Sequence, residues 1–259
     1  MRTVLQAENI GKNFGGLRAL DSIDLEIKQG EIVALIGPNG AGKTTLFNCI
    51  TGMHAPTDGK VKIIPPDRDE ICVNGFKPNI ITELGLARTF QNIRLFNKMT
   101  VLQNVMVGRH CRNKNTFLEA IVRNARFKRE ERETLEYSLG LLETFGLAGH
   151  AHQVAENLPY ADQRRLEIAR ALATEPFLLL LDEPAAGMNP HETYELDQLI
   201  LKIRDDRKIS ILLIEHDMKL VMRISDRIFV MNQGQNIADG SPEEIRNNET
   251  VIHAYLGEE

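Results

Sequence analysis

Two segments of the sequence have residue types and spacing that suit chemistry on a phosphate-containing ligand. The first is GPNGAGKTT, which meets the phosphate-loop pattern G-x-x-x-x-G-K-[ST]. Glycines let successive backbone N–H groups face an anion, Lys43 adds a positive charge for the β- and γ-phosphates, and the Thr44 hydroxyl can ligate Mg²⁺. The predicted nucleotide-binding residues of this loop are Gly37, Pro38, Asn39, Gly40, Ala41, Gly42, Lys43, Thr44 and Thr45.

The second segment is a pair of acids, Asp182 and Glu183, that follows the apolar run Phe177 to Leu181. Such a run predicts a central strand of a parallel sheet, and open α/β sheets bind ligands at the carboxyl ends of their strands. We expect Asp182 to orient Mg²⁺ and Glu183 to act as general base for an attacking water. The alternative is a solvated strand end, but the buried run and the phosphate loop both count against it.

A histidine, His216, follows a second apolar run, Ile209 to Ile214. A lone histidine is more often structural than catalytic. Because the carboxyl ends of neighbouring parallel strands meet at one edge of a sheet, we expect His216 to lie beside Asp182 and Glu183. Its position in the sequence IEHD therefore favours a functional role.

The elements that position these residues have the patterns of an α/β fold. An apolar strand, Ile32 to Ile36, precedes the phosphate loop, and the loop opens a helix. Val4 to Phe14 and Ser22 to Ile27 predict an antiparallel flap with a turn at Gly15 and Gly16. An amphipathic helix precedes the strand at Phe177, and Pro176 stops it.

Residues from about 100 to 158 show helical spacing and no strand pattern. We predict one domain over residues 1–259, with a nucleotide-binding core and flap at 1–99 and 159–259 and a helical subdomain at 100–158. The stretch 123–133 holds five cations and three anions, which is typical of a solvated helix face. Contact with a membrane protein or with lipid headgroups is the alternative.

Composition excludes several other classes of protein. A net charge of −5 and an aromatic content of 5% do not favour nucleic-acid binding, so we expect no nucleic-acid partner. Cys49, Cys72 and Cys111 lack the spacing of a disulfide framework or zinc site. We find neither a signal peptide nor an apolar run long enough to cross a bilayer, which predicts a cytosolic protein whose membrane work needs partners.

The chain resembles an ABC-type ATPase over nearly all of its 259 residues. The motifs that carry this resemblance are the phosphate loop, the LLLLDEP run and the basic helix DQRRLEIARAL. The resemblance implies a RecA-like core of the P-loop NTPase fold, an antiparallel β flap, a helical subdomain, and the ligands ATP and Mg²⁺. It makes His216 a switch histidine that contacts the γ-phosphate and Gln91 a Q-loop glutamine in the Mg²⁺ and water network. Phe14 takes the position of an aromatic that stacks on adenine, with a core phenylalanine as the alternative.

In this family a signature turn, usually Leu-Ser-Gly-Gly-Gln, reaches across a dimer interface to the partner's ATP. Here the corresponding residues are Pro159, Tyr160, Ala161 and Asp162, after Leu158. Pro159 lacks a hydroxyl and an N–H, and Ala161 adds a methyl group where glycine lets the backbone approach an anion. Removing one donor of this kind costs roughly 10²- to 10³-fold in rate, so we expect ATP binding to survive better than turnover.

Within the family, the chain is similar to the ATP-binding subunits of bacterial branched-chain amino-acid importers. The residues that carry this likeness are FGGLRAL, RTFQNIRLF, DEPAAGMNP, LLIEHDMKLVM and the ending AYLGE. The likeness implies two membrane permease subunits, a second ATP-binding subunit and a periplasmic substrate-binding protein, with the chain on the cytoplasmic face of the inner membrane. We expect a heterodimer of ATP-binding subunits, with a homodimer as the alternative.

Other functions stay open at this point. Urea or amide importers and lipopolysaccharide exporters have similar ATPases, and a soluble, non-transport ABC ATPase is a further alternative. Ala161 also allows a partner that senses nucleotide and hydrolyses little. The segment with Ile93, Leu95, Phe96 and Met99 is either ordinary core or part of a groove for a permease helix.

Overall fold

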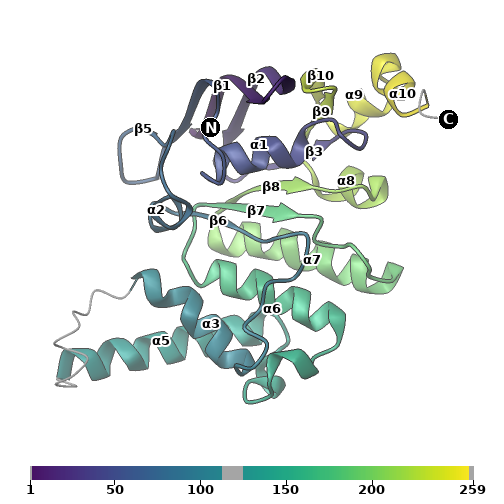
Figure 1. The fold of residues 1–259 in the computed structure, drawn as a ribbon. Helices are drawn as coiled ribbons and strands as arrows, with labels where there is room; N and C mark the ends of the chain where they lie inside the picture. The colour runs from purple at the N-terminus through teal and green to yellow at the C-terminus, as the bar shows by residue number, and fades with distance from the viewer. Residues whose placement is uncertain (1, 113–124, 257–259) are drawn as a thin grey trace. The chain divides into compact units, whose positions relative to one another are not determined.

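The structure, a computed structural model, describes residues 2–112 and 125–256 (Figure 1). Three predictions touch residues outside this range: the helical stretch from about 100 to 158, in residues 113–124, the first two residues of the charged stretch 123–133, and part of the ending AYLGE. The chain forms two compact units. Unit 1 comprises Met1–Arg88 and Phe177–Glu259, and unit 2 comprises Thr89–Pro176. The predicted division at 100–158 is a different one and stays a prediction.

Unit 1 contains a six-stranded sheet in the order β10-β9-β3-β8-β7-β6. Its strands are β3 (Ile32–Ile36), β6 (Leu86–Arg88), β7 (Leu178–Asp182), β8 (Ser210–Ile214), β9 (Arg227–Asn232) and β10 (Gln235–Gly240). All but the edge strand β10 pair in parallel, and every residue of β3, β7 and β8 is buried. Ile214 lies opposite both Leu35 and Asp182, so the carboxyl ends of the three central strands meet at one edge.

A second sheet of unit 1 is antiparallel, in the order β2-β1-β4-β5. Its strands are β1 (Thr3–Phe14), β2 (Leu17–Lys28), β4 (Asp58–Ile63) and β5 (Ile71–Cys72). The predicted flap is thus confirmed, with its turn at Gly15 and Gly16. Figure 1 shows α1 (Lys43–Ile50) between the two sheets, and its Leu46, Phe47 and Ile50 join side chains of both sheets in one buried cluster.

The other helices of unit 1 are α2 (Pro78–Glu83), α7 (Pro190–Arg207), α8 (Met218–Ile224), α9 (Pro242–Arg246) and α10 (Glu249–Leu256). In three of these helices, α7, α8 and α9, the side chain of the N-cap residue accepts hydrogen bonds from backbone N–H groups of the first turn. Asn189 caps α7 and Ser241 caps α9, each in a capping box, and Asp217 caps α8. These caps fix where each helix begins, and so fix the length of the loop between it and the preceding strand.

Unit 2 is helical in its described part, apart from one isolated bridge between Thr100 and Val154. Its helices are α3 (Val101–Arg109), α5 (Ala125–Thr144), α6 (Tyr160–Leu172) and the 3₁₀ turns η1 (His110–Arg112), η2 (Ala148–His150) and η3 (Ala155–Asn157). Helix α3 packs on α5 and α6. In α5 the charged stretch forms pairs at i,i+4 spacing, Arg126 with Glu130 and Arg129 with Glu133, as expected of a solvated face.

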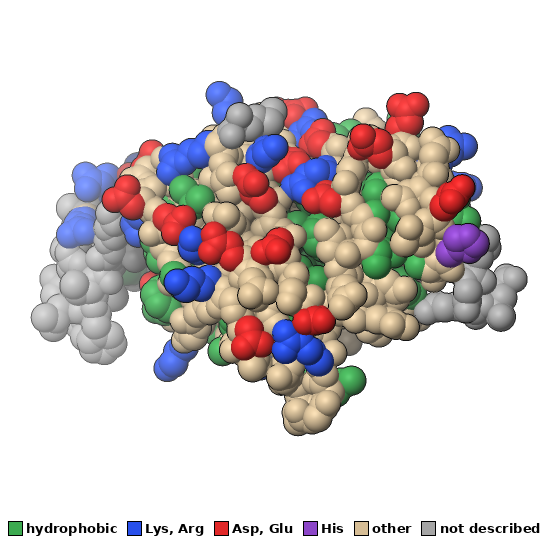
Figure 2. All heavy atoms as spheres, turned by 90° about the horizontal axis from the view of Figure 1, so that it is seen from above, with side chains coloured by type: hydrophobic (Ala, Val, Ile, Leu, Met, Phe, Trp, Pro, Cys, Tyr) green, Lys and Arg blue, Asp and Glu red, His purple; other side chains and the backbone are tan. Residues whose placement is uncertain are grey.

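None of the helices described is long and apolar enough to span a membrane. Acidic and basic side chains are interspersed on the face shown in Figure 2. Unit 1 also has exposed ion pairs, such as Arg18 with Asp21.

Candidate nucleotide-binding and catalytic site

The phosphate loop joins β3 to α1 and depends on glycine at two positions. Gly37 has φ +148°, and a Cβ there would lie 2.1 Å from the carbonyl oxygen of Met231. Gly42 has φ +100°, and a Cβ there would lie 2.8 Å from the carbonyl oxygen of Ala19. Any side chain at either position would collide with backbone that cannot swing away. The loop therefore keeps the tight path that turns its N–H groups and the start of α1 toward one point.

Lys43 is the first residue of α1, and its side chain is folded back over the loop. The residue is only 7% exposed, and Nζ donates hydrogen bonds to the carbonyl oxygens of Gly37 at 2.5 Å and Pro38 at 2.9 Å. The ammonium is thus held at the centre of the loop, while Thr44, one residue later, is exposed. The first-turn N–H groups of a helix lack intrahelical acceptors, and here no side chain caps them. The arrangement suits a phosphate chain.

Asp182 lies at the end of β7, is 3% exposed, and is held by an arginine that sequence reasoning missed. Its Oδ2 accepts a hydrogen bond of 2.7 Å from Nη2 of Arg88. Nη1 of the same guanidinium donates to Oδ1 of Asn48 at 2.7 Å and to the hydroxyl of Thr51 at 3.2 Å. Arg88 ends β6, a strand of three residues, so it carries no local signal of its role. The ion pair fixes the carboxylate that we expect to orient Mg²⁺.

Glu183 and His216 are brought together, as predicted. Nε2 of His216 lies 3.1 Å from Oε1 of Glu183, and the Glu183 backbone N–H donates to the carbonyl of Ile214 at 2.9 Å. Glu183 has φ +47°, a left-handed conformation that is unfavourable for any residue with a side chain. Strained backbone of this kind persists where the surrounding structure holds it, and it is common at functional sites.

The predicted Q-loop glutamine, Gln91, belongs to unit 2 and is exposed. Its backbone carbonyl accepts a hydrogen bond of 2.7 Å from Nη2 of Arg164, and Nη1 donates to the carbonyl of Phe90 at 2.7 Å. Arg164 is fully buried and pairs with Glu167 at 2.9 Å, and burial raises the pKa of Glu167 above its ordinary value. The structure therefore ties this backbone to α6 through two carbonyl groups, which the sequence did not indicate.

The predicted signature turn is part of a helix. Pro159 is the N-cap of α6, with φ −53° and ψ 152°, and Tyr160, Ala161 and Asp162 form the first turn. Ala161 is 8% exposed, and the side chain of Pro159 makes no capping hydrogen bond. First-turn N–H groups have no acceptor within a helix, so the donors available here are those of the backbone.

Phe14 ends β1 and is 43% exposed, so the alternative of a core phenylalanine is wrong. The ring of His54 meets it edge-on at 5.3 Å, and Nζ of Lys12 lies 5.2 Å from its centroid. Adenine stacking by Phe14 stays a prediction.

In the segment with Ile93, Leu95, Phe96 and Met99, the side chains of Phe96 and Met99 are exposed, at 46% and 38%. The interpretation of this segment as ordinary core is therefore wrong for these two residues.

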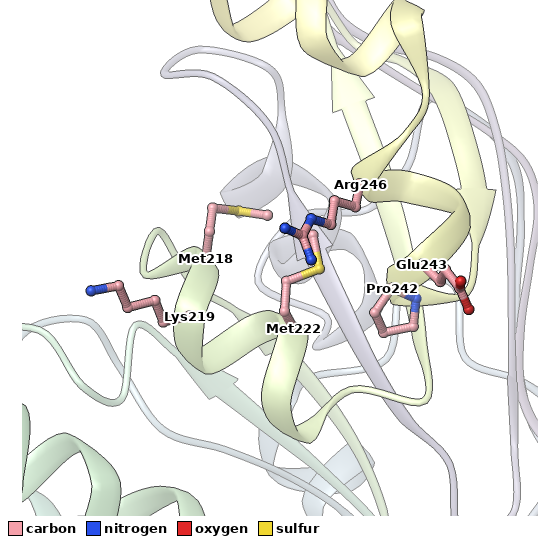
Figure 3. A pocket seen from close by; sticks show the side chains of 6 residues that line it. All are labelled: Met218, Lys219, Met222, Pro242, Glu243 and Arg246. Atoms are coloured by element: carbon pink, nitrogen blue, oxygen red, sulfur yellow. The ribbon is translucent and has the colours of Figure 1, made fainter.

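A separate hollow of about 600 Å³ lies beside α8 and α9 in unit 1 (Figure 3). Its lining residues are Met218, Lys219, Met222, Pro242, Glu243 and Arg246. None of them belongs to the phosphate loop or to the pair Glu183 and His216, so this hollow is not the predicted nucleotide site.

Comparison with known proteins decides the family. The profile of the ABC transporter family matches residues 20–186, and that of the branched-chain amino acid ATP-binding cassette transporters matches residues 235–259. The chain is 50% identical over 255 residues to the high-affinity branched-chain amino acid transport ATP-binding protein LivG of Escherichia coli, covering 98% of each chain. It is 48% identical over 257 residues to BraF of Pseudomonas aeruginosa, a protein of the same description, covering 99% of each. The chain belongs to the ABC transporter family.

A solved ABC cassette in its ADP conformation shares this ABC fold with a TM-score of 0.85 and 31% identity, covering 99% of this chain and 100% of the other. The predicted P-loop ABC fold and the resemblance to ABC ATPases are therefore confirmed, and the chain is an ABC-type ATPase. Binding of adenine nucleotide goes with that membership. The roles of individual residues in this ABC ATPase follow from the geometry above and stay predictions.

Proposed function

We propose that this ABC ATPase hydrolyses ATP to drive import of branched-chain amino acids, leucine, isoleucine and valine. The observation that carries the cargo is the 50% identity to LivG over 98% of both chains. The match of residues 235–259 to the C-terminal segment of branched-chain amino acid cassettes supports it independently, because this segment lies outside the ATPase motifs.

In the proposed reaction the phosphate loop holds ATP and Lys43 balances its charge. An approaching γ-phosphate would draw Nζ of Lys43 from the carbonyls of Gly37 and Pro38, which the ammonium contacts now. Negative charge gathers on the phosphate oxygens during transfer, so a buried cation and a helix N-terminus stabilise the transition state more than the ground state.

Glu183 is the proposed general base. Its carboxylate takes the proton of the attacking water as the water oxygen bonds to the γ-phosphorus and the bond to ADP breaks, giving ADP and phosphate. His216 lies 3.1 Å from the accepting oxygen, and we assign it to hold the carboxylate and contact the γ-phosphate. Nearly half of the His216 side chain is exposed, which leaves it accessible to a ligand at the sheet edge.

The donors at this site fit Mg²⁺. The described residues contain no cluster of three or more His, Cys, Asp or Glu side chains that could hold a metal by themselves. Mg²⁺ bound with a nucleotide uses one or two protein oxygens together with phosphates and water, so the hydroxyl of Thr44 and the carboxylate of Asp182 suffice. We assign both residues to it, with the amide oxygen of Gln91. The metal would neutralise phosphate charge when bound.

For the assembly we propose two membrane permease subunits, a second ATP-binding subunit and a periplasmic substrate-binding protein, with this chain peripheral on the cytoplasmic face of the inner membrane. The names of LivG and BraF, which describe transport ATP-binding proteins, support a subunit role. We propose an unequal pair of ATP sites, because Ala161 and Pro159 replace the family's usual residues in one signature turn. A homodimer is the alternative.

Uptake of radiolabelled leucine in cells that carry the chain on a plasmid, in place of the chromosomal copy, tests the proposal. Lys43→Ala is expected to abolish uptake, because the phosphate loop loses its cation. Lys202→Ala, on the exposed surface of α7, is the control and should leave uptake unchanged. Loss of urea uptake with normal leucine uptake would overturn the assignment of cargo, and no transport defect with Lys43→Ala would overturn the proposal that this phosphate loop drives transport.

A further inference from the structure

The residue before the switch histidine, Glu215, has no role in the reaction as described so far. It follows β8 directly and is 4% exposed. Its Oε1 accepts a hydrogen bond of 2.8 Å from the backbone N–H of Ala185, and its Oε2 accepts one of 3.1 Å from that of His216. One carboxylate therefore connects the loop after β7 with the loop after β8.

These two loops carry the proposed base and its partner. Ala185 lies two residues beyond Glu183, whose backbone has the left-handed φ of +47°. The side chains of Glu183 and His216 meet at 3.1 Å, and Glu215 connects the backbones of the same two loops. Strained backbone holds its conformation only while its surroundings fix it, and the bond to Ala185 is one such restraint.

A buried carboxylate is an unfavourable choice for a purely structural bridge. Burial raises the pKa of Glu215, and the charge of Glu183 raises it further, whereas the backbone N–H groups of Ala185, His216 and Asp217 lower it. What a carboxylate offers is two acceptor oxygens and no donor, which matches N–H groups arriving from two loops. An amide of the same shape has one oxygen and would turn an NH₂ toward an N–H.

We propose that Glu215 is a positioning residue for ATP hydrolysis, which holds the carboxylate of Glu183 and the imidazole of His216 in register by binding the backbone of both loops. The two backbone N–H groups that its carboxylate binds, those of Ala185 and His216, both lie outside the phosphate loop. Its loss should therefore affect the chemical step and leave nucleotide binding intact. The inference rests on the proposed hydrolysis at Glu183.

The test compares steady-state ATPase of the full-length chain with its Glu215→Gln variant. We expect kcat to fall about 10- to 100-fold, since a displacement of about 1 Å has an effect of this size, with KM and the affinity for a fluorescent ATP analogue within about 3-fold of the parent. The control is Glu31→Gln, a carboxylate only 10% exposed that precedes β3, pairs with Arg227 at 2.7 Å and accepts a hydrogen bond of 2.8 Å from the backbone N–H of Lys28. Its kcat should stay within about 3-fold of the parent.

A second measurement separates positioning from general destabilisation. In a Glu183→Gln background the Glu215→Gln change should lower the residual rate by less than about 2-fold, because a residue that acts through Glu183 has nothing left to position. If Glu215→Gln does not fold, Glu215→Asp keeps both acceptors one methylene short and should show the same selective loss of kcat. An unchanged kcat in an active parent, equal effects on kcat and KM, or a full additional loss in the double variant would overturn the inference. An inactive parent would instead contradict the proposed function.

Discussion

Replacing Arg88 by methionine is expected to destabilise the chain strongly through Asp182. The two side chains are 9% and 5% exposed and meet at 2.7 Å, so the change removes a guanidinium that contacts a buried carboxylate. Removing one partner of a buried ion pair costs about 3–5 kcal/mol of the free energy of unfolding. A Coulomb energy of about 4 kcal/mol, for charge centres about 4 Å apart at an effective dielectric constant of about 20, agrees with that range.

The guanidinium also donates to Asn48 on α1 and to Thr51, the residue after this helix, and methionine removes both hydrogen bonds. Each such bond contributes about 1 kcal/mol net. The range of about 3–5 kcal/mol comes from substitutions that also lost hydrogen bonds of this kind. We therefore expect the loss of stability for Arg88→Met in the upper half of that range and not above it.

Urea denaturation of the full-length chain measures this free energy. Arg18→Met is the matched control, because Arg18 pairs at 2.8 Å with Asp21 but both side chains are about 40% exposed. Water and salt screen an exposed pair of this kind, so it contributes little to stability. Adding Asp182→Asn to Arg88→Met should restore part of the lost stability, since a neutral amide needs no cation. Equal costs for Arg88→Met and Arg18→Met, or full additivity of the Arg88 and Asp182 changes, would refute the reasoning.

Three further outcomes are expected. Glu183→Gln should lower phosphate release about 10²- to 10⁴-fold while a fluorescent ATP analogue binds as in the parent, because only the base is lost; a similar loss of binding would argue against that role. Ala161→Gly should raise the ATPase rate of the pair of ATP-binding subunits. A glycine in α6 should also lower the free energy of unfolding by up to about 1 kcal/mol, measured by thermal melting. An unchanged rate would mean that the methyl group does not crowd the nucleotide. Burial raises the pKa of Asp197 to about 6 from 3.8, so the contribution of this group to stability should fall as the pH rises from about 4 to 6, where the unfolded chain releases this proton first; in urea titrations, Asp197→Asn should lose less stability than the parent over this range.

Much of the sheet could be predicted because its signals are local. The runs before Gly37, Asp182 and Glu215 are continuous and apolar, and each leads at once into a segment of the candidate site. A buried strand must consist of such residues, and a parallel sheet must place its carboxyl ends together. These two facts place Glu183 and His216 at one edge of the sheet, and the structure, in which β7 and β8 are neighbours, brings the two side chains into contact.

The parts that sequence reasoning missed depend on contacts between distant residues. Strand β6 has three residues and α2 has six, too short for a periodic pattern. Arg88 reaches Asp182 across 94 positions, and Arg164 reaches Phe90 across 74. An arginine looks the same in a sequence whether it is solvated or fully buried, so neither role could be read before the fold was known.

Four acids follow or end β7 and β8, and their contacts indicate why Glu183 is the one that can serve as the base. Asp182 is engaged by the permanent cation of Arg88, and accepting a proton would give up that ion pair. Glu215 is occupied by backbone N–H groups from two loops, and Asp217 caps α8 through the N–H groups of its first turn. Glu183 faces an imidazole, a partner that can itself give up or take a proton, and its side chain is 19% exposed against 5% for Asp182. Of these four carboxylates it combines access to water with a partner that tolerates a change of charge, which is what general-base catalysis requires.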